Sequence, residues 1–499
     1  CGRICNRRCE DACTRGTVDQ AVAIDEVKKF IAQRDLDAAT RYVPPVVTPT
    51  RAGGFDQKIA IIGAGPAGLS CAFYLAEKGY KPVVFEKNER PGGMLTYGIP
   101  SFKLQKDVIE AEVEVIRLMG AEFRYGVEVG RDVTLDELRE QGFKAFYVAI
   151  GCQGGRLAGI PGEDAEDVTV AVDFLREVNS GKIDALPGRT IVVGGGNVAI
   201  DVARNACRLG SEHVEMFCLE SEAQMPASEE EHREAVEDGA HISCGWGPKE
   251  VHLDEAGRVC GITFKRCTRV FDDEGRFAPE YDENDLRRVD ADRVVMSIGQ
   301  SIVWGDLLAG SKVELGRGQG ALADPQTYQT AEPDIFVGGD VYTGPSFAID
   351  AIAAGHEAAV SIHRFVQPGS TLTIGRNQRR YTALDRDDVV LEGYDNASRE
   401  VAHVDREREK AAPFSEYVET FTEEQVRAET ARCLGCGASI VDPNKCIGCG
   451  LCTTKCAFDA IHLDRDRPEC STMVKYEQKL PSLGKYALKR AIKIKFGRK

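Results

Sequence analysis

Residues 58–87 read KIAIIGAGPAGLSCAFYLAEKGYKPVVFEK, and this stretch decides the fold class. An apolar run, a glycine-rich turn, a helical pattern and a second apolar run predict strand, turn, helix and strand. In the turn, Gly63 permits the tight bend, Gly65 lets the backbone approach a pyrophosphate, and Gly68 permits close packing of helix on strand. The sequence therefore predicts a dinucleotide-binding βαβ unit in an α/β domain.

The residues beyond this turn indicate that its cofactor is FAD. Glu86 ends the second strand, where a carboxylate can accept hydrogen bonds from ribose hydroxyls. Asp340 follows another apolar run, placed for a ribityl chain, and a helix beginning near Ser346 directs its amides towards a reduced flavin ring. The predicted FAD-binding residues are Gly63, Gly65, Pro66, Ala67, Gly68, Glu86, Lys87, Gly92, Gly93, Met94, Ile99, Gly151, Gly339, Asp340, Ser346, Phe347 and Ala348.

A second glycine turn, GGGNVA at residues 194–199, has the G-x-G-x-x-A form and again lies between a strand and a helix pattern. The next strand ends in Cys218, Leu219 and Glu220, where an NADP site would carry arginines. A carboxylate there repels a 2'-phosphate, so we predict NAD(H); an exposed strand-end acid is the alternative interpretation. The predicted NAD-binding residues are Gly194, Gly195, Gly196, Asn197, Val198, Ala199, Glu220 and Gly299.

Composition limits the protein class. The chain has 499 residues, 43% of them hydrophobic, which is enough for two or three cores. Its formal net charge of -16 argues against nucleic acid as the main partner. No apolar run reaches eighteen residues, so we expect no membrane-spanning helix. Because Cys1 opens neither a signal peptide nor a complete start, we expect further residues upstream.

The last 25 residues depart from this acidic balance. Residues 475–499 carry nine Lys or Arg side chains and one acid, interleaved with apolar residues such as Leu488 and Ile492. One interpretation is a basic amphipathic helix that docks on a partner or an anionic membrane surface. The other is a solvated terminus.

The eighteen cysteines are clustered at the two ends of the chain. Four lie within residues 1–13 and seven within residues 433–470, while seven others are scattered singly. A disulfide-rich secreted protein would need an export signal, so the clusters are better interpreted as metal ligands in a reducing cytoplasm. The predicted metal ligands near the C-terminus are Cys433, Cys436, Cys446, Cys449, Cys452, Cys456 and Cys470.

Residues 445–461, KCIGCGLCTTKCAFDAI, contain the C-x2-C-x2-C-x3-C run of bacterial ferredoxins. In such runs the first three thiolates bind one [4Fe-4S] cluster and the fourth reaches another, so further ligands are required. Cys433, Cys436 and Cys470 are the candidates nearby. Seven cysteines suit two clusters completed by a non-cysteine ligand or a partner's cysteine; one cluster, or zinc at Cys433 and Cys436, are the alternatives.

Several motifs together resemble one family. They are CGRICNRRCEDAC (1–13), GAGPAG (63–68), GGMLTYGIPSFKL (92–104), GGGNVAIDVAR (194–204), EAQMPA (222–227) and FVGGDVYTGPSFAIDAIAAG (336–355). Over roughly residues 1–365 the chain resembles the flavoproteins that include the glutamate synthase small subunit. The family also includes the N-terminal half of dihydropyrimidine dehydrogenase and the large subunit of NADH-dependent ferredoxin:NADP oxidoreductase.

The resemblance implies an α/β protein with two Rossmann-like domains, in which the NAD domain is inserted into a discontinuous FAD domain. It also implies two N-terminal [4Fe-4S] clusters, with Cys5, Cys9 and Cys13 as predicted metal ligands and the others supplied by residues upstream. Lys28 lies near a position that supplies a non-cysteine ligand in relatives. Zinc, or no metal, is the alternative there. The stretch at 218–220 departs from the Tyr-Arg-Arg typical of NADP-using members.

The expected organisation runs in chain order. It comprises a truncated iron–sulfur helical segment (1–42), a linker (43–55), the first segment of the FAD domain (56–155), an NAD(H) domain (156–300), the second segment of the FAD domain (301–366), a polar connection wrapping the surface (367–420), a ferredoxin-like module (421–474) and the basic tail (475–499). The helical pattern at Ile24, Val27 and Ile31 predicts a helix, and Thr422 is a predicted N-cap of another.

These features together predict an NAD(H)-dependent electron-transfer subunit of a larger complex, which passes hydride between NAD(H) and FAD and single electrons to or from clusters. Its partners would be other redox subunits, including ferredoxin or an electron-bifurcating partner. No side-chain acid or base is predicted to be catalytic, because the protein positions and tunes the cofactor. A glutamate synthase small subunit is one alternative and a scaffold with relic cofactor sites is another. The NAD segment lacks a C-x-x-C pair, which argues against a disulfide reductase.

Overall fold

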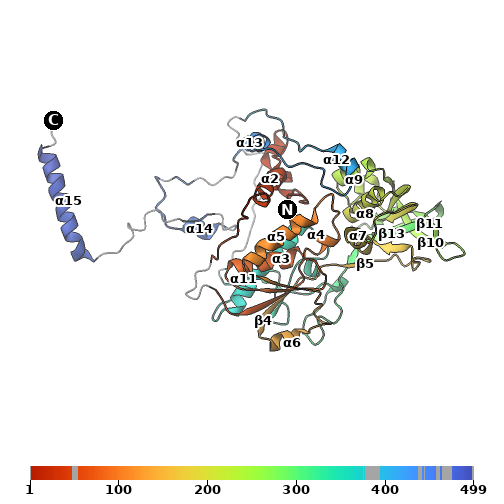
Figure 1. Ribbon diagram of the computed structural model, residues 1–499, viewed down its shortest axis with the longest axis horizontal. Helices are drawn as coiled ribbons and strands as arrows, with labels where there is room; N and C mark the ends of the chain where they lie inside the picture. The colour runs from red at the N-terminus through yellow and green to blue at the C-terminus, as the bar shows by residue number, and fades with distance from the viewer. Residues whose placement is uncertain are drawn as a thin grey trace. The chain divides into compact units, whose positions relative to one another are not determined.

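The computed structural model describes residues 2–47, 54–374, 376, 394–436, 441–442, 444–456, 461–463 and 475–496. The chain forms two compact units, of which the first comprises Cys1–Ile374 and Arg386–Cys436. The second comprises Gly375–Asp385 and Gly437–Lys499. Figure 1 labels many of the elements of both units.

A five-stranded parallel sheet contains the first glycine turn. Its order is β15-β4-β1-β2-β3, so a strand from late in the chain completes a sheet whose first strand begins at Lys58. Apolar strands suit a sheet covered on both faces, and residues 59–62 of β1 are all buried. The strands are β1 (Lys58–Ile62), β2 (Val83–Glu86), β3 (Glu122–Tyr125), β4 (Phe143–Val148) and β15 (Ile335–Val337).

Two of the helices that pack on this sheet, α3 and α11, lie close together at small residues. The helix α3 begins after Gly65 with Pro66 in its first turn and packs along α11, as Figure 1 shows. A side chain at Gly355 of α11 would collide with the backbone of α3 at Ala67. The helices are α3 (Pro66–Glu77), α4 (Met94–Tyr97), α5 (Lys106–Leu118), α6 (Leu135–Glu140), α10 (Asp340–Thr343) and α11 (Ala348–Val366).

A second five-stranded parallel sheet contains the second glycine turn, in the order β6-β13-β7-β8-β9. One face packs on helices α7 (Ala171–Asn179), α8 (Asn197–Arg208) and α9 (Glu229–Glu237). The strands are β6 (Val168–Val170), β7 (Arg189–Val193), β8 (His213–Cys218), β9 (His241–Cys244) and β13 (Arg293–Met296).

An antiparallel sheet covers the opposite face of this second sheet. The rings of Phe217 and Phe264 stack there with centroids 3.9 Å apart, inside a shared apolar core. Its strands are β10 (Trp246–Leu253), β11 (Val259–Phe271) and β12 (Phe277–Val289). The two parallel sheets with their covering elements form the two halves of the first unit. The chain passes between these halves twice, and the strands β5 (Gly154–Gly155) and β14 (Gln300–Ser301) of the two passages pair with each other. Short 3-10 turns occur at Glu222–Gln224 and Arg317–Gln319.

The N-terminal segment comprises α1 (Arg8–Asp11), a 3-10 turn (Thr14–Thr17) and α2 (Ile24–Leu36). The predicted α2 helix forms, but it is buried through charged residues. Ile31 is 61% exposed, whereas Asp25 and Lys29 are 2% and 4% exposed. Lys29 Nζ donates to the carbonyl of Val418 at 2.8 Å, so this helix is held by charge and hydrogen bonds.

The segment that contacts α2 comes from the polar connection. It includes α12 (Arg406–Ala411), and α13 (Glu423–Ala431) follows it. The predicted N-cap of α13 is confirmed, because Thr422 and Gln425 form a reciprocal capping box. The described residues 394–420 of the connection are exposed or half-buried, except Tyr417, which is 5% exposed. Residues 377–393 of the connection and 48–53 of the linker lie outside the described residues.

The second unit contains α14 (Leu451–Lys455), which includes Cys452 of the ferredoxin-like run, and α15 (Tyr476–Phe496). The basic tail is therefore helical over most of its length, and none of the described α15 residues is buried. Within the ranges that the structure describes, no helix combines the length and apolar character needed to cross a membrane.

Candidate functional site

The first glycine turn has the geometry of a nucleotide cradle. Gly63 has φ +105°, and a β-carbon there would lie 2.5 Å from the carbonyl oxygen of Ala149. A β-carbon at Gly68 would collide with the carbonyl of Gly63. By contrast, no atom lies within 4 Å of a β-carbon placed on Gly65. The turn is therefore tight on its protein side and open at Gly65, where a pyrophosphate would approach.

Glu86 lies at the end of β2 and is 3% exposed. Its carboxylate accepts hydrogen bonds from the Ala64 amide at 2.8 Å and from the Asn88 amide at 2.9 Å. These bonds hold the carboxylate in one orientation beside the glycine turn. Each carboxylate oxygen can accept more than one hydrogen bond, so acceptor capacity remains for ribose hydroxyls.

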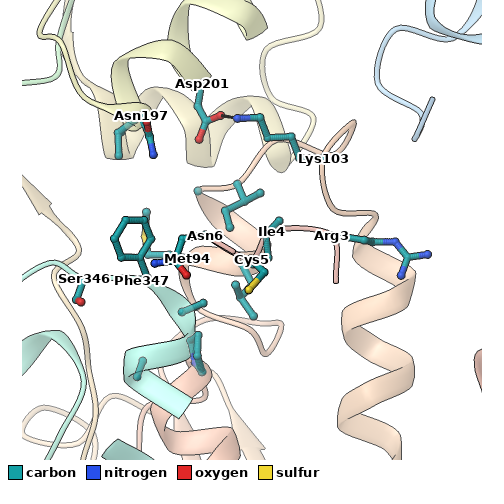
Figure 2. Close-up of a pocket in the computed structure, with 18 of the residues that line it drawn as sticks. Arg3, Ile4, Cys5, Asn6, Met94, Lys103, Asn197, Asp201, Ser346 and Phe347 are labelled. Carbon is teal, nitrogen blue, oxygen red and sulfur yellow. Dashed lines mark hydrogen bonds and ion pairs between the residues drawn. The ribbon is translucent and has the colours of Figure 1, made fainter. Parts of the chain in front are cut away.

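A cavity of about 1160 Å³ extends from this turn. Figure 2 shows residues of α8, of the N-terminal loop and of the start of α11 meeting around it. This volume suits a large ligand better than a small metabolite. The predicted FAD residues that line the cavity are Gly63, Gly65, Pro66, Ala67, Glu86, Lys87, Gly93, Met94, Ile99, Gly151, Gly339, Asp340, Ser346, Phe347 and Ala348. Gly68 and Gly92 do not line it.

Asp340 lines the same cavity and lies a few residues before α11. Burial raises the pKa of its carboxyl to about 6, and its Oδ1 accepts a hydrogen bond from the Ser346 amide at 3.3 Å. The helix α11 begins just beyond, with Phe347 as its N-cap. The positive end of the α11 dipole therefore faces the cavity, as predicted for stabilising charge on a flavin ring.

The second glycine turn also has the predicted backbone. Gly194 has φ +140°, a β-carbon at Gly194 would collide with the carbonyl of Ser297, and nothing lies within 4 Å of one at Gly196. Asn197 and Val198, at the start of α8, line the same cavity as the FAD residues. The other predicted NAD residues do not line it, namely Gly194, Gly195, Gly196, Ala199, Glu220 and Gly299.

Glu220 lies over the second glycine turn. Its Oε2 would be 3.2 Å from a β-carbon placed on Gly195, and its carbonyl accepts from the Gly245 amide at 2.9 Å. An arginine also lies in this region, because Arg266 Nη1 contacts the Cys244 carbonyl at 3.5 Å and its guanidinium stacks on Trp246. The carboxylate of Glu220 therefore lies beside the second glycine turn, and the guanidinium of Arg266 lies in the same region.

The sequence did not predict a buried cluster of charged side chains that lines the cavity. Lys103 Nζ lies 2.6 Å from Asp201 Oδ1 (Figure 2). It also pairs with Glu231. Burial lowers the pKa of Lys103, but attraction to the two carboxylates outweighs it and the net pKa is raised. Burial raises the pKa of Asp201. Lys103 lies in the GGMLTYGIPSFKL motif and Asp201 in the GGGNVAIDVAR motif. The motifs therefore drew attention to both residues, but neither motif indicated that the two side chains pair.

Cys5 is the cysteine of the predicted metal ligands that lines this cavity. Lys28 Nζ lies 3.3 Å from its sulfur. The same loop is tied to both halves of the first unit, because Arg8 pairs bidentately with Asp350 of α11 and Arg7 with Glu230 of α9. The N-terminal cysteine segment is therefore held against the cofactor cavity.

The other predicted ligands are divided between the two units. Cys9 and Cys13 lie in the first unit with Cys433 and Cys436, and Cys446, Cys449, Cys452 and Cys456 lie in the second. Cys470 lies outside the described residues. Among the residues that the structure describes, no three Cys, His, Asp or Glu side chains form a group able to hold a metal ion.

Comparison with known proteins identifies the class. Residues 57–355 match the pyridine nucleotide-disulphide oxidoreductase family, and residues 439–462 match the 4Fe-4S binding domain. The structure is similar to FprA from Mycobacterium tuberculosis in complex with NADPH, with a TM-score of 0.54, 19% identity, and coverage of 62% of this chain and 84% of that one. At this identity the likeness supports the fold alone.

Three curated relatives are subunits of redox enzymes by name. The NADP(+)-dependent formate dehydrogenase subunit beta of Moorella thermoacetica is 34% identical over 87% of this chain and 64% of its own length. The glutamate synthase [NADPH] small chain of Escherichia coli is 34% identical over 74% and 80%. The NAD-dependent dihydropyrimidine dehydrogenase subunit PreT of Escherichia coli is 32% identical over 74% and 81%.

The chain belongs to the pyridine nucleotide-disulphide oxidoreductase family and, within it, to the flavin and iron–sulfur electron-transfer subunits related to the glutamate synthase small chain. The predicted resemblance and fold class are confirmed. The chain spans less than two thirds of the formate dehydrogenase subunit that it matches.

Proposed function

We propose that this chain is the NAD(H)-dependent subunit of a larger cytoplasmic redox complex, with FAD along the first glycine turn and NAD(H) along the second. One observation carries the proposal. A single cavity is lined by the FAD turn, by the start of α8 from the nicotinamide turn, and by Cys5 of the N-terminal cysteine segment. The chemistry that bound FAD supplies is hydride exchange with the nicotinamide and single-electron exchange with 4Fe-4S clusters.

The chain's own residues bind and orient in this proposal. The open backbone at Gly65 and the fixed carboxylate of Glu86 would hold the adenosine diphosphate moiety of FAD. Asp340 would accept from the ribityl chain, and the N-terminus of α11 would stabilise negative charge on the flavin ring. The N-terminus of α8 would bind the pyrophosphate of NAD(H).

The preference for NAD(H) rests on Glu220, because a carboxylate beside Gly195 repels a 2'-phosphate and can accept from a 2'-hydroxyl. Arg266 favours the competing assignment, NADP(H), since a guanidinium binds phosphate in bidentate fashion. We assign NAD(H), because Glu220 lies against the turn itself whereas Arg266 is stacked on Trp246.

Steady-state kinetics with NADH and NADPH, using an artificial electron acceptor, test this assignment. We expect a higher kcat/KM with NADH, and a smaller ratio in Glu220→Gln. Glu222→Gln, an exposed acid two residues later, is the matched control and should leave the ratio unchanged. Arg266→Ala should leave the kinetics with NADH unchanged. The assignment would be contradicted if the wild type preferred NADPH and the Arg266→Ala variant lost only its activity with NADPH.

The identity of the complex calls for a separate experiment. Anaerobic isolation from the source, mass spectrometry of co-purifying subunits, and counts of iron, zinc and flavin would identify the partners and the cluster number. We expect at least one further redox subunit, of ferredoxin-linked or bifurcating type. A glutamate-forming large subunit would favour the alternative glutamate synthase assignment, and protein without flavin would favour the scaffold.

A further inference from the structure

We propose that Cys218 and Cys244 form a reversible disulfide that weakens nucleotide binding at the second glycine turn. The link to binding rests on the proposed NAD(H) site, whereas the disulfide itself does not. The modifying reagent would be a small disulfide of the glutathione type.

The two thiols face each other at the ends of neighbouring strands. Cys218 and Cys244 are the last residues of β8 and β9 and are paired directly in the parallel register. Their sulfur atoms lie 3.6 Å apart. A disulfide requires about 2.05 Å between sulfurs, so the two sulfur atoms must approach each other by about 1.5 Å, which rotation of the side chains and a small shift of the strand ends can supply.

The two cysteines differ in access to solvent. Cys218 is 2% exposed, whereas Cys244 is only partly buried. Burial raises the pKa of the Cys218 thiol, which makes it a poor first nucleophile. Cys244 would therefore react with the reagent first, and Cys218 would close the bond.

The reaction balances as two thiol–disulfide exchanges. The Cys244 thiolate attacks one sulfur of oxidised glutathione, whose sulfur–sulfur bond breaks and releases one glutathione. Cys218 then loses its proton and attacks the Cys244 sulfur of the mixed disulfide, releasing the second glutathione. Two protein thiols are oxidised and one glutathione disulfide is reduced to two thiols.

The pair lies at the nucleotide end of the turn. A β-carbon on Gly195 would be 2.8 Å from Cys218 Cβ and 3.2 Å from Glu220 Oε2. The amide of Gly245, next to Cys244, donates to the Glu220 carbonyl at 2.9 Å. Closing the bond repositions the Cys218 side chain beside the glycine turn and acts on the backbone next to the Glu220 carbonyl, so we expect nucleotide binding to weaken.

The test uses the anaerobic holoprotein equilibrated in glutathione buffers of graded potential, with thiols then blocked and disulfides located by peptide mass spectrometry. We expect a link between Cys218 and Cys244, with iron and flavin content unchanged. ADP-ribose, which contains the adenine ribose but cannot carry hydride, is the binding probe in calorimetry. We expect oxidation to raise its Kd about tenfold, within the usual range of coupling between sites.

Linkage supplies an independent check. Since ADP-ribose binds the dithiol form about tenfold more tightly, saturating ADP-ribose should make the disulfide easier to reduce by the same factor. For this two-electron couple, that shift raises the midpoint potential by about 30 mV.

Variants separate the alternatives. Cys244→Ser should bind ADP-ribose like the reduced wild type at every potential. Cys218→Ala should instead retain glutathione on Cys244 under oxidising conditions, without a protein disulfide. Cys260→Ser, a partly buried thiol of the same domain, should behave like wild type. No link, a link to a cysteine outside this pair, or a link that leaves ADP-ribose affinity unchanged would overturn the proposal. Failure of the reduced protein to bind ADP-ribose would instead contradict the proposed nucleotide site. The peptide map tests the link between Cys218 and Cys244 independently of nucleotide binding.

Discussion

Arg432 and Glu429 form an ion pair 2.6 Å long in which the side chains are 1% and 0% exposed. Arg432 immediately precedes Cys433, and its carbonyl accepts a hydrogen bond at 3.1 Å from Arg15, two residues after Cys13. One buried polar cluster therefore joins the start of the C-terminal cysteine group to the N-terminal one. Arg15 and Arg432 are 417 residues apart in the sequence.

Glu429→Gln should destabilise the first unit by about 3 kcal/mol, because it leaves the Arg432 guanidinium buried with a weakened set of partners. Chemical denaturation, followed by circular dichroism, measures the loss. Glu424→Gln on the same helix is the control, since this exposed acid should change stability by no more than about 0.5 kcal/mol. Equal effects of the two variants would contradict the structural role of the buried pair.

Two glycines of the first turn should respond differently to alanine. Gly65→Ala should leave the apoprotein's stability within about 0.5 kcal/mol, because its β-carbon meets no protein atom. It should weaken FAD binding at least tenfold, or about 1.4 kcal/mol, because the methyl group occupies the approach of the pyrophosphate. Gly68→Ala should lower both stability and FAD content, since it collides with Gly63. Flavin fluorescence and thermal unfolding distinguish the two outcomes.

FAD binding should depend on pH through Asp340. Its pKa is raised from 3.8 to about 6, so the carboxyl is ionised above pH 6 and protonated below it. For folding, this sign means that burying the charge costs stability above pH 6, a cost relieved as pH falls towards 3.8. A ribityl hydroxyl that donates to the carboxylate favours the ionised form, so FAD affinity should fall about fourfold between about pH 7.5 and 5.5.

The control for this pH dependence is the amide variant. In Asp340→Asn the FAD affinity should be lower and flat over the same range, whereas Asp306→Asn at the surface should keep the wild-type profile. An unchanged profile in Asp340→Asn would show that another group titrates.

Lys103→Met should slow reduction of the flavin by NADH about tenfold, because Lys103 links the FAD-binding domain to Asp201 of α8 and small misplacements of reacting groups are costly. FAD content should stay at the wild-type level. Stopped-flow absorbance measures the rate, and Lys182→Met, an exposed lysine, is the control. Lys103→Arg should restore some of the rate; lowered stability with an unchanged rate would assign Lys103 a structural role only.

The local elements were predictable from short stretches of sequence. The strand, turn and helix at residues 58–77 and the capping box at Thr422 form as expected. Their causes are glycine conformation, apolar strands and a side-chain cap, all of which act within a few residues. The presence of α2 was predictable for the same reason, but its buried face was not. Lys29 faces inwards because its partner, the Val418 carbonyl, comes from a distant segment, whereas Asp25 pairs with Arg7 of the N-terminal loop.

Two glycine turns, each between an apolar strand and a helix, were enough to predict two nucleotide-type folds in a flavin and nicotinamide oxidoreductase. That information is local, because a turn needs only its own glycines. In contrast, three contacts are seen only in the folded chain: Lys103 meets Asp201, Cys5 lines the cavity and Cys218 faces Cys244. These contacts depend on how strands and helices pack across long separations, and the pattern of any one segment does not encode its distant neighbour.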